Sequence, residues 1–168
     1  MVVSVRPAQV ADLGAILADQ RPQLKEVPMK QVLFACVHNT GRSQMAEAFF
    51  NRMADPSKAR AMSGGTEPAS GMNQTVIAVM NEVGIDLVAE GHHPKIADLD
   101  ALHEGGLPIS MGCGVSLACP VKLGKMEDWG LDDPKDQPIE RVRAIRDEIK
   151  IRVEGLVQAL DVGRAATR

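Results

Sequence analysis

The order of strand-like and helix-like segments constrains the fold of this chain more than any other feature of the sequence. Residues 31–37 form an apolar run typical of a buried strand, and residues 42–54 follow with apolar side chains at helical spacing. Short strands are also predicted over 59–63, 107–111 and 125–131, and helices over 72–83 and 139–160. Strands that alternate with helices form parallel sheets, which bind ligands at the carboxyl ends of their strands. The sequence therefore predicts an α/β fold with its site at that edge.

The bulk properties of the chain exclude several classes of function. Its 168 residues can form one domain with its own core, and a net charge of −3 argues against general binding to nucleic acid or a membrane surface. No apolar run is long enough to cross a bilayer, and Arg6 and Asp12 interrupt the first residues in a way that does not fit a signal peptide. We therefore expect a cytoplasmic protein, whose reduced cysteines serve catalysis or metal binding more often than structure.

Two parts of the chain differ in pattern. Residues 30–168 carry the alternation and are predicted to form the domain, whereas residues 1–29 stand apart. This first part could form a strand and a helix, so we expect a packing or dimerising extension rather than a disordered arm.

The most distinctive chemistry follows the first predicted strand. Cys36 ends this strand, and after a short loop Arg42 and Ser43 open the next helix in a Cys-x5-Arg-Ser pattern. The loop amides, the positive end of the helix and the Arg42 guanidinium can bind a tetrahedral oxyanion together, and their field favours the nucleophilic thiolate of Cys36. An unreactive core cysteine, the alternative, would need neither the polar loop nor the arginine. The predicted oxyanion-binding residues are Val37, His38, Asn39, Thr40, Gly41 and Arg42.

Two further cysteines, Cys113 and Cys119, lie close together in a glycine-containing segment. Two thiols on one loop, in a chain that also carries a nucleophilic thiol, suggest a disulfide relay. Two alternatives stay open: two unrelated buried thiols, or a zinc site completed by two of His92, His93 and His103. The five-residue gap between the cysteines is not a familiar zinc spacing, so we expect neither a metal nor another cofactor.

A possible general acid stands in the segment Asp132-Asp133-Pro134. An aspartate held by a following proline, in a loop after a strand, can deliver a proton to a leaving oxygen. Because Asp-Pro pairs also favour plain turns, this segment alone would not indicate chemistry.

Taken together, these residues resemble an arsenate reductase of the low-molecular-weight protein tyrosine phosphatase superfamily, of the thioredoxin-coupled type with three cysteines. The resemblance runs from about residue 31 to residue 160 and implies a small four-stranded parallel sheet with helices on both faces. Besides the three features above, it rests on Ser43-Gln44-Met45-Ala46-Glu47, Met62-Ser63-Gly64-Gly65, His92-His93-Pro94-Lys95 and Arg141-Val142-Arg143.

The resemblance implies the reduction of arsenate to arsenite. Cys36 attacks the arsenic while Arg42 and the loop amides hold the oxygens. Ser43 donates a hydrogen bond to the Cys36 thiolate, and Asn39 shapes the loop. Asp133, rather than Asp132, aligns with the acid that protonates the departing hydroxyl.

The resemblance also implies how the thiols are regenerated. Cys113 attacks the Cys36–arsenic adduct, and Cys119 then moves the disulfide to the surface, where thioredoxin reduces it. A low-molecular-weight thiol with a glutaredoxin-like protein is the alternative reductant. The two cysteines are one residue closer together here than in well-known relatives, which bears on the geometry of the last exchange.

Some relatives bind potassium near the loop, through residues that correspond to Asn39, Glu47 and Ser63 and an acidic group. Lys95 stands at the acidic position in this chain. We therefore expect the Lys95 ammonium group to replace the ion.

Two other functions compete with arsenate reduction. A low-molecular-weight protein tyrosine phosphatase shares the loop and the acid, but such enzymes resemble one another in carrying aromatic residues beside the pocket, often just after Asp-Pro. Here Lys135 follows Pro134, and only 2% of the residues are aromatic. A non-catalytic oxyanion or redox sensor, the other alternative, is favoured by nothing beyond the N-terminal extension.

Overall fold

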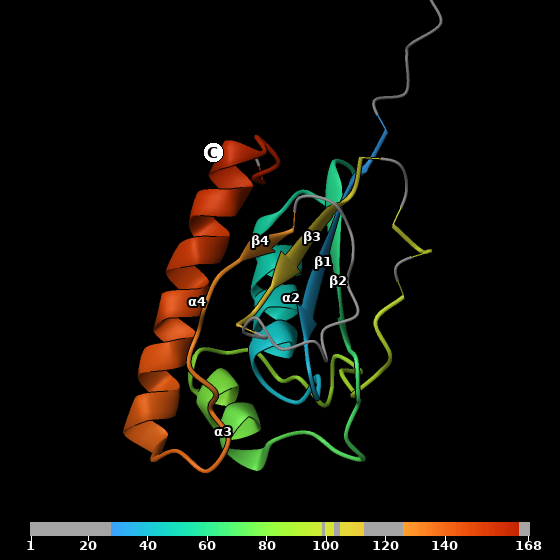
Figure 1. Cartoon of the computed structure of the whole chain (residues 1–168). Coiled ribbons are helices and arrows are strands. Elements are labelled where there is room, and N and C mark those ends of the chain that lie inside the picture. The colour runs from blue at the N-terminus through green and yellow to red at the C-terminus, as the bar shows by residue number, and fades with distance from the viewer. Residues whose placement is uncertain (1–27, 99, 103–104, 113–125, 165–168) are drawn as a thin grey trace, which may run out of the picture.

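The computed structural model describes residues 28–98, 100–102, 105–112 and 126–164 (Figure 1). Within these residues, four strands form one sheet in the order β2-β1-β3-β4, and every neighbouring pair is parallel. The predicted four-stranded parallel sheet is thereby confirmed. The strands are β1 Lys30–Cys36, β2 Ala59–Gly65, β3 Leu107–Ser110 and β4 Glu127–Asp128.

β1 lies inside the sheet because its side chains are apolar in both directions. Every residue from Val32 to Cys36 is buried. Cys36 pairs with Gly65 at the end of β2, and Ala35 pairs with Ser110 at the end of β3. The thiol therefore lies at the carboxyl edge of the sheet.

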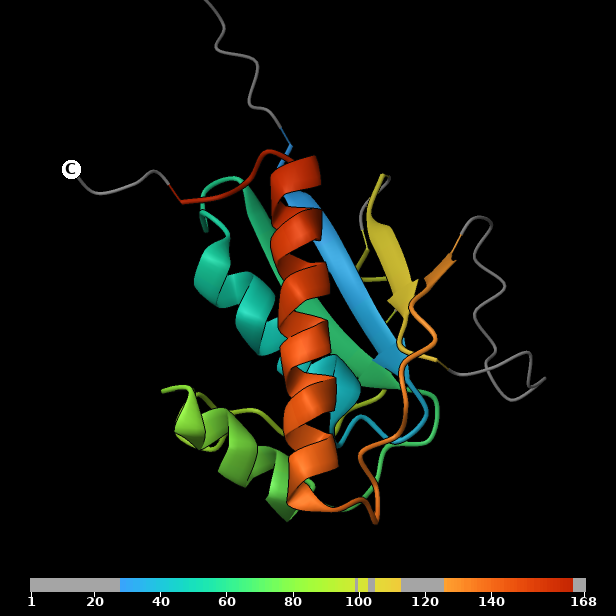
Figure 2. The same cartoon turned by 90° about the vertical axis from the view of Figure 1, so that its left-hand side faces the viewer.

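Three helices belong to the described part of the chain: α2 Arg42–Met53, α3 Gln74–Glu82 and α4 Ile139–Ala159. α2 packs on β1 and β2, and α4 packs on α2, so that both lie on one face of the sheet (Figures 1 and 2). α3 lies beyond the carboxyl ends of the strands and contacts α4. On the opposite face of β1, Leu33 is buried as well.

An aromatic cluster joins these layers. The ring of Phe34 in β1 lies 6.2 Å from that of Phe50 in α2 and 5.5 Å from that of Trp129, measured between centroids. Aromatic pairs at such distances add stability beyond the area they bury. The cluster fixes α2 against β1, and with it Arg42 at the first turn of α2.

Several predicted boundaries differ from the observed ones by one or more residues, and two of these differences have a visible cause. The helix predicted over 72–83 begins at Gln74, because the Asn73 side chain caps it by accepting the N–H groups of Thr75 and Val76. The strand predicted over 125–131 is reduced to Glu127–Asp128, because the Asp128 carboxylate accepts the N–H of Gly130 and the chain turns there.

Several predictions fall on residues outside the described part of the chain. Cys113, Cys119 and His103 are among them, so the disulfide relay and its zinc alternative stay predictions. The N-terminal extension also stays a prediction, since the described part begins at residue 28. Among the helices that are described, none has the length and apolar character that a bilayer span requires.

Candidate active site

Cys36 lines a cavity of about 20 Å³ at the carboxyl edge of the sheet and is itself only 4% exposed. The residues predicted to bind an oxyanion all line this cavity except Val37, whose carbonyl accepts the N–H of Glu67 at 2.9 Å. The cavity, called the cup below, is lined by Cys36, His38, Asn39, Thr40, Gly41, Arg42, Asp133 and Lys135.

The loop that forms the cup is held from behind by the segment after β2. The N–H groups of Thr66 and Ala69 donate to the carbonyls of Cys36 and His38 at 3.2 and 3.1 Å. Asn39 adopts a left-handed conformation with φ of 53°, which asparagine tolerates better than most residues, and its N–H donates to Cys36 Sγ at 3.1 Å. The backbone of the loop is therefore fixed around the sulfur.

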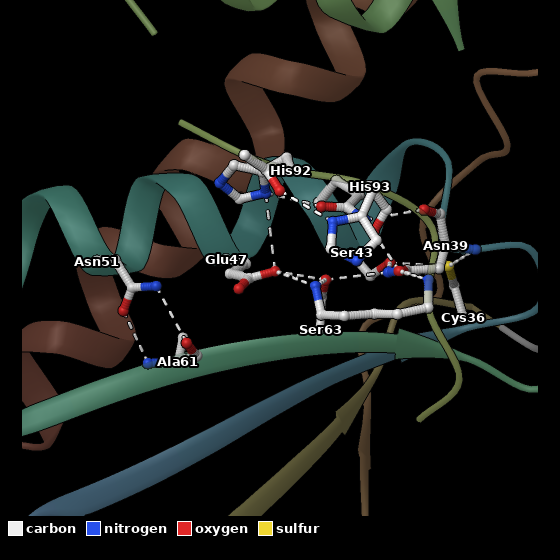
Figure 3. A network of polar contacts seen from close by, with 12 residues as sticks. Cys36, Asn39, Ser43, Glu47, Asn51, Ala61, Ser63, His92 and His93 are labelled. Carbon is white, nitrogen blue, oxygen red and sulfur yellow. Dashed lines mark hydrogen bonds and ion pairs between the residues drawn. The ribbon is translucent and has the colours of Figure 1, made fainter. Parts of the chain in front are cut away.

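The Asn39 side chain sets the direction of the hydrogen bonds around the thiol. Its oxygen accepts the Lys95 backbone N–H at 2.9 Å, and because a backbone N–H can only donate, the identity of that oxygen is certain. Nδ2 of Asn39 therefore donates to the hydroxyl oxygens of Ser43 and Ser63, at 2.8 and 3.0 Å. The Ser43 hydroxyl proton is then left for Cys36 Sγ, 2.9 Å away (Figure 3). This is the polarity that favours a thiolate.

The pKa of Cys36 nevertheless lies above its ordinary value. Burial of the sulfur is the largest cause, because a thiolate loses its hydration there. Hydrogen bonds from the Ser43 hydroxyl and the Asn39 N–H, and the positive charge of Arg42, lower the pKa but do not outweigh burial. The sequence predicts that the loop favours the thiolate; the loop does supply donors to the sulfur, and burial opposes their effect on the pKa.

Arg42 is bound on three sides. Its Nη1 donates to the carbonyls of Met111 and Leu131 at 3.0 and 2.8 Å, and its Nη2 pairs with Asp133 Oδ2 at 3.0 Å. Asp133 is brought to the cup, whereas the neighbouring Asp132 pairs with Arg141 of α4. Of the two aspartates in the predicted acid segment, only Asp133 can therefore reach a group bound in the cup.

A second layer of charge lies behind the loop. The Glu47 carboxylate accepts the Ser63 hydroxyl at 2.5 Å and the Lys95 ammonium at 3.3 Å, and Lys95 Nζ also lies 3.4 Å from Ser63 Oγ. His92 Nδ1 lies 3.8 Å from the same carboxylate. Figure 3 shows this group joined through Ser63 to Asn39. The Lys95 ammonium thus lies beside Glu47 and Ser63, two of the residues that correspond to potassium ligands in some relatives.

Two polar residues behind the cup, the buried Gln44 and the partly buried His92, were not predicted to belong to this site; His92 was considered only as a possible zinc ligand. Gln44 is fully buried in the first turn of α2 and bonds to Asn39 and His92. Each stands in a segment that carried the family resemblance, but no spacing in the sequence relates the two segments. Among the described residues, no cluster of His, Cys, Asp and Glu is arranged to hold a metal ion.

Comparison with known proteins assigns the family. The profile of the family described as low molecular weight phosphotyrosine protein phosphatase matches residues 31–111. A putative arsenate reductase of Halobacterium salinarum is 38% identical over 127 residues, which are 73% of this chain and 87% of that protein. The chain belongs to the low molecular weight phosphotyrosine protein phosphatase family. Another member, a glutaredoxin arsenate reductase of Synechocystis, is 40% identical over 131 residues, 77% of this chain and 97% of its own length.

Solved structures with the same fold are also similar to this chain. An arsenate reductase in a phosphate-binding state superimposes with a TM-score of 0.65 at 37% identity, covering 79% of this chain and 99% of that one. A thioredoxin-dependent arsenate reductase of Corynebacterium glutamicum gives a TM-score of 0.63 at 34% identity, covering 80% and 63%. The predicted low-molecular-weight phosphatase fold is confirmed.

A groove of about 470 Å³ adjoins the cup in this family member. The two share His38, Thr40 and Lys135. Beyond them the groove is lined by amides, small residues, one methionine and the acidic Asp136, and none of its lining residues is Phe, Tyr or Trp. A tetrahedral oxyanion in the cup would therefore have a polar wall beside it rather than a surface for a phenyl ring.

Proposed function

We propose that this protein reduces arsenate to arsenite, with Cys36 as the nucleophile. The observation that carries the proposal is the position of the Cys36 sulfur in the oxyanion cup, with the Ser43 hydroxyl and the Asn39 N–H as donors. A cysteine placed beside an arginine and these donors can attack a tetrahedral oxyanion once it has lost its proton, and a purely structural cysteine needs none of these groups. The names of the relatives support arsenate as that oxyanion.

In the first step, the Cys36 thiolate attacks the As(V) centre and a sulfur–arsenic bond forms. A hydroxyl group leaves the arsenic and takes a proton from Asp133, so that water is released. Arg42 and the loop amides hold the remaining oxygens through charge-assisted hydrogen bonds. For this, Arg42 Nη2 exchanges its contact with Asp133 for one with the substrate, and Asp133 becomes free to carry the proton.

In the second step, the Cys113 thiolate attacks the Cys36 sulfur, and the electron pair of the sulfur–arsenic bond passes to arsenic. Arsenite, As(III), leaves and a Cys36–Cys113 disulfide remains, so two thiols are oxidised for each arsenate reduced. Cys119 then attacks Cys113, which frees Cys36. One contact supports this proposal: Arg42 Nη1 donates to the carbonyl of Met111, which precedes Cys113 by two residues in the sequence.

A dithiol protein is then needed to reduce the Cys113–Cys119 disulfide, and we propose thioredoxin. The thioredoxin-dependent relative supports this reductant, whereas the Synechocystis relative is named for glutaredoxin. A glutaredoxin-like protein with a low-molecular-weight thiol is therefore the alternative. Both systems belong to a reducing compartment, and we place the protein in the cytoplasm.

The test is arsenate-dependent NADPH consumption with thioredoxin and thioredoxin reductase, repeated with glutathione and glutaredoxin. Wild type should turn over, and Cys36→Ser should be inactive with either system. Failure of Cys113→Ser and Cys119→Ser with thioredoxin would support the relay. Full activity of Cys119→Ser with glutaredoxin alone would favour the alternative reductant.

A phosphatase remains the competing enzyme, since phosphate can occupy the same cup. The polar groove gives no aromatic wall for a phenyl ester, so we expect only a side activity. Cleavage of a phenyl phosphate by a protein that leaves arsenate unchanged would reverse this ranking. A protein that binds both anions and turns over neither would be the oxyanion sensor.

A further inference from the structure

His92 lies behind the cup, in the segment that follows α3. Its side chain is 10% exposed, and its Nδ1 lies 2.7 Å from Gln44 Oε1. Figure 3 shows its ring over Glu47, on the side of the network away from Cys36. His92 therefore does not touch a group bound in the cup and can act on it only through other residues.

The surroundings of Gln44 decide which atom of His92 carries a hydrogen. Gln44 Nε2 lies 2.8 to 3.0 Å from three oxygens, the carbonyl of His93 and both the carbonyl and the side-chain oxygen of Asn39. Because oxygens only accept here, the Gln44 amide nitrogen must face them and its oxygen must face His92. His92 Nδ1 is therefore the donor.

The same contact agrees with a neutral imidazole. Burial is the largest effect on the pKa of His92 and lowers it, since the ring loses water that would stabilise its charge. Glu47 and Glu90 raise this pKa, while Lys95 and His93 lower it. The net direction is downward, so the ring is uncharged at neutral pH with one hydrogen, on Nδ1.

Gln44 then holds the residue that orients the nucleophile. It donates to two oxygens of Asn39, whose backbone is left-handed and whose N–H and side chain serve Cys36 and Ser43. Without the hydrogen bond from His92, the side-chain oxygen of Gln44 would be buried without a partner. If the Gln44 amide rotated, this oxygen would face the two oxygens of Asn39 that now accept from Gln44 Nε2. The hydrogen bonds thus form a chain from His92 through Gln44, Asn39 and Ser43 to Cys36. Each bond in this chain depends on the one before it.

We propose that His92 is a positioning residue for Cys36, which acts through Gln44 and Asn39 to orient the donors on the sulfur. The proposal deepens the proposed function, because it takes Cys36 as the nucleophile. It concerns the thiol itself, so it can be tested without arsenate.

The test measures the alkylation rate of Cys36 by iodoacetamide against pH, read from the Cys36 peptide by mass spectrometry in the full-length chain. His92→Leu removes the donor at similar size, and His92→Asn restores an amide N–H near the position of Nδ1. The matched control is His93→Leu, since the one hydrogen bond of the His93 ring within the described residues is to the Gly91 carbonyl, while the His93 backbone carbonyl accepts from Gln44. His92→Ala replaces His92→Leu if the latter does not fold.

We expect His92→Leu to raise the pKa of Cys36 and to slow its alkylation at neutral pH about three- to tenfold. His92→Asn should return most of that loss, and His93→Leu should match wild type. Equal profiles for His92→Leu and His93→Leu would overturn the proposal, as would a folded His92→Asn that behaves like His92→Leu. A wild type that never reduces arsenate would reject the proposed function while leaving this comparison intact.

Discussion

Arg42 and Asp133 form an ion pair in the lining of the cup, and an oxyanion that binds Arg42 Nη2 has to replace this contact. Asp133 is half exposed and contributes a negative charge that competes with the incoming anion. We expect Asp133→Asn to bind phosphate about three- to tenfold more tightly in calorimetry, because the competing charge is gone. Arsenate turnover should fall about a hundredfold or more, because the proton donor is gone as well.

The chain offers a matched control for this experiment. Asp132→Asn removes the same charge one residue earlier, where the carboxylate pairs with Arg141 outside the cup. Its phosphate affinity and turnover should stay close to wild type. Identical phosphate affinity in the two variants would show that Asp133 does not compete for Arg42.

The pKa of Cys36 leads to a prediction about stability. Since burial raises this pKa in the folded chain, the unfolded chain loses the same proton at lower pH. Deprotonation therefore favours unfolding, and stability should fall as the pH rises through the ordinary thiol range. Urea unfolding at about pH 7.5 and about pH 10 should show a smaller loss for Cys36→Ser than for wild type. An equal loss would mean that the buried thiol does not govern this decline.

Lys95 supports a prediction about ions. Its ammonium lies 3.3 Å from the Glu47 carboxylate and 3.4 Å from the Ser63 hydroxyl, so a fixed positive charge already serves both. We expect turnover to be the same in potassium and sodium buffers of equal ionic strength. Lys95→Met should slow turnover, because Glu47 loses its ion pair. Strong activation of wild type by potassium would contradict this assignment.

At the residue scale, the sequence predicts the groups that line the cup better than the groups behind them. Cys36 and Arg42 flank one short loop, so their spacing in the sequence is enough to predict that both line the cup. Gln44 and His92 are far apart in the sequence and meet only because the segment after α3 returns to the first turn of α2. Local patterns do not record which distant polar side chain satisfies a buried amide.

At the element scale, α2 begins directly after Gly41, which lies against Pro134 of the segment Asp132-Asp133-Pro134. No side chain caps this helix, and a Cβ added at Gly41 would lie 2.8 Å from Cγ of Pro134. We expect Gly41→Ala to push the Asp133–Pro134 segment away from Arg42 and to lower turnover about tenfold or more. Alkylation of Cys36 should change little, because Ser43 and Asn39 keep their contacts.

Gly155 of α4 provides the control, since nothing lies within 4 Å of a Cβ added there. Gly155→Ala should leave turnover unchanged and stabilise the protein by about 0.5–1 kcal/mol in thermal unfolding, because alanine favours the helix. Equal turnover in both variants would show that the Gly41–Pro134 contact does not position the acid.

The elements themselves were largely predictable. The observed bounds of α4, Ile139–Ala159, differ from the predicted range 139–160 by one residue. The prediction is accurate because a long amphipathic helix repeats its apolar period over many turns. β4 is two residues long, and a side-chain contact from Asp128 ends the strand pattern early. Short elements at the edge of a sheet carry too few residues for periodicity to fix their limits.

At the scale of the whole molecule, the cup joins parts of the chain that are distant in the sequence. Arg42 bonds to residues after β3 and after β4, and Asn39 bonds to β2 and to Lys95. Occupation of the cup should therefore resist global unfolding. Phosphate at a hundred times its dissociation constant should stabilise wild type by about 2.7 kcal/mol, seen as a higher Tm. Arg42→Ala should lose this increase, and an increase of the same size in that variant would place the bound anion elsewhere.

The guanidinium of Arg42 holds the carbonyls of Met111 and Leu131, which flank residues 113–125 in the sequence. One side chain thus holds the backbone that follows β3 and the backbone that follows β4 beside the cup. The loss of Arg42 would therefore release both segments at once, besides removing the positive charge from the cup.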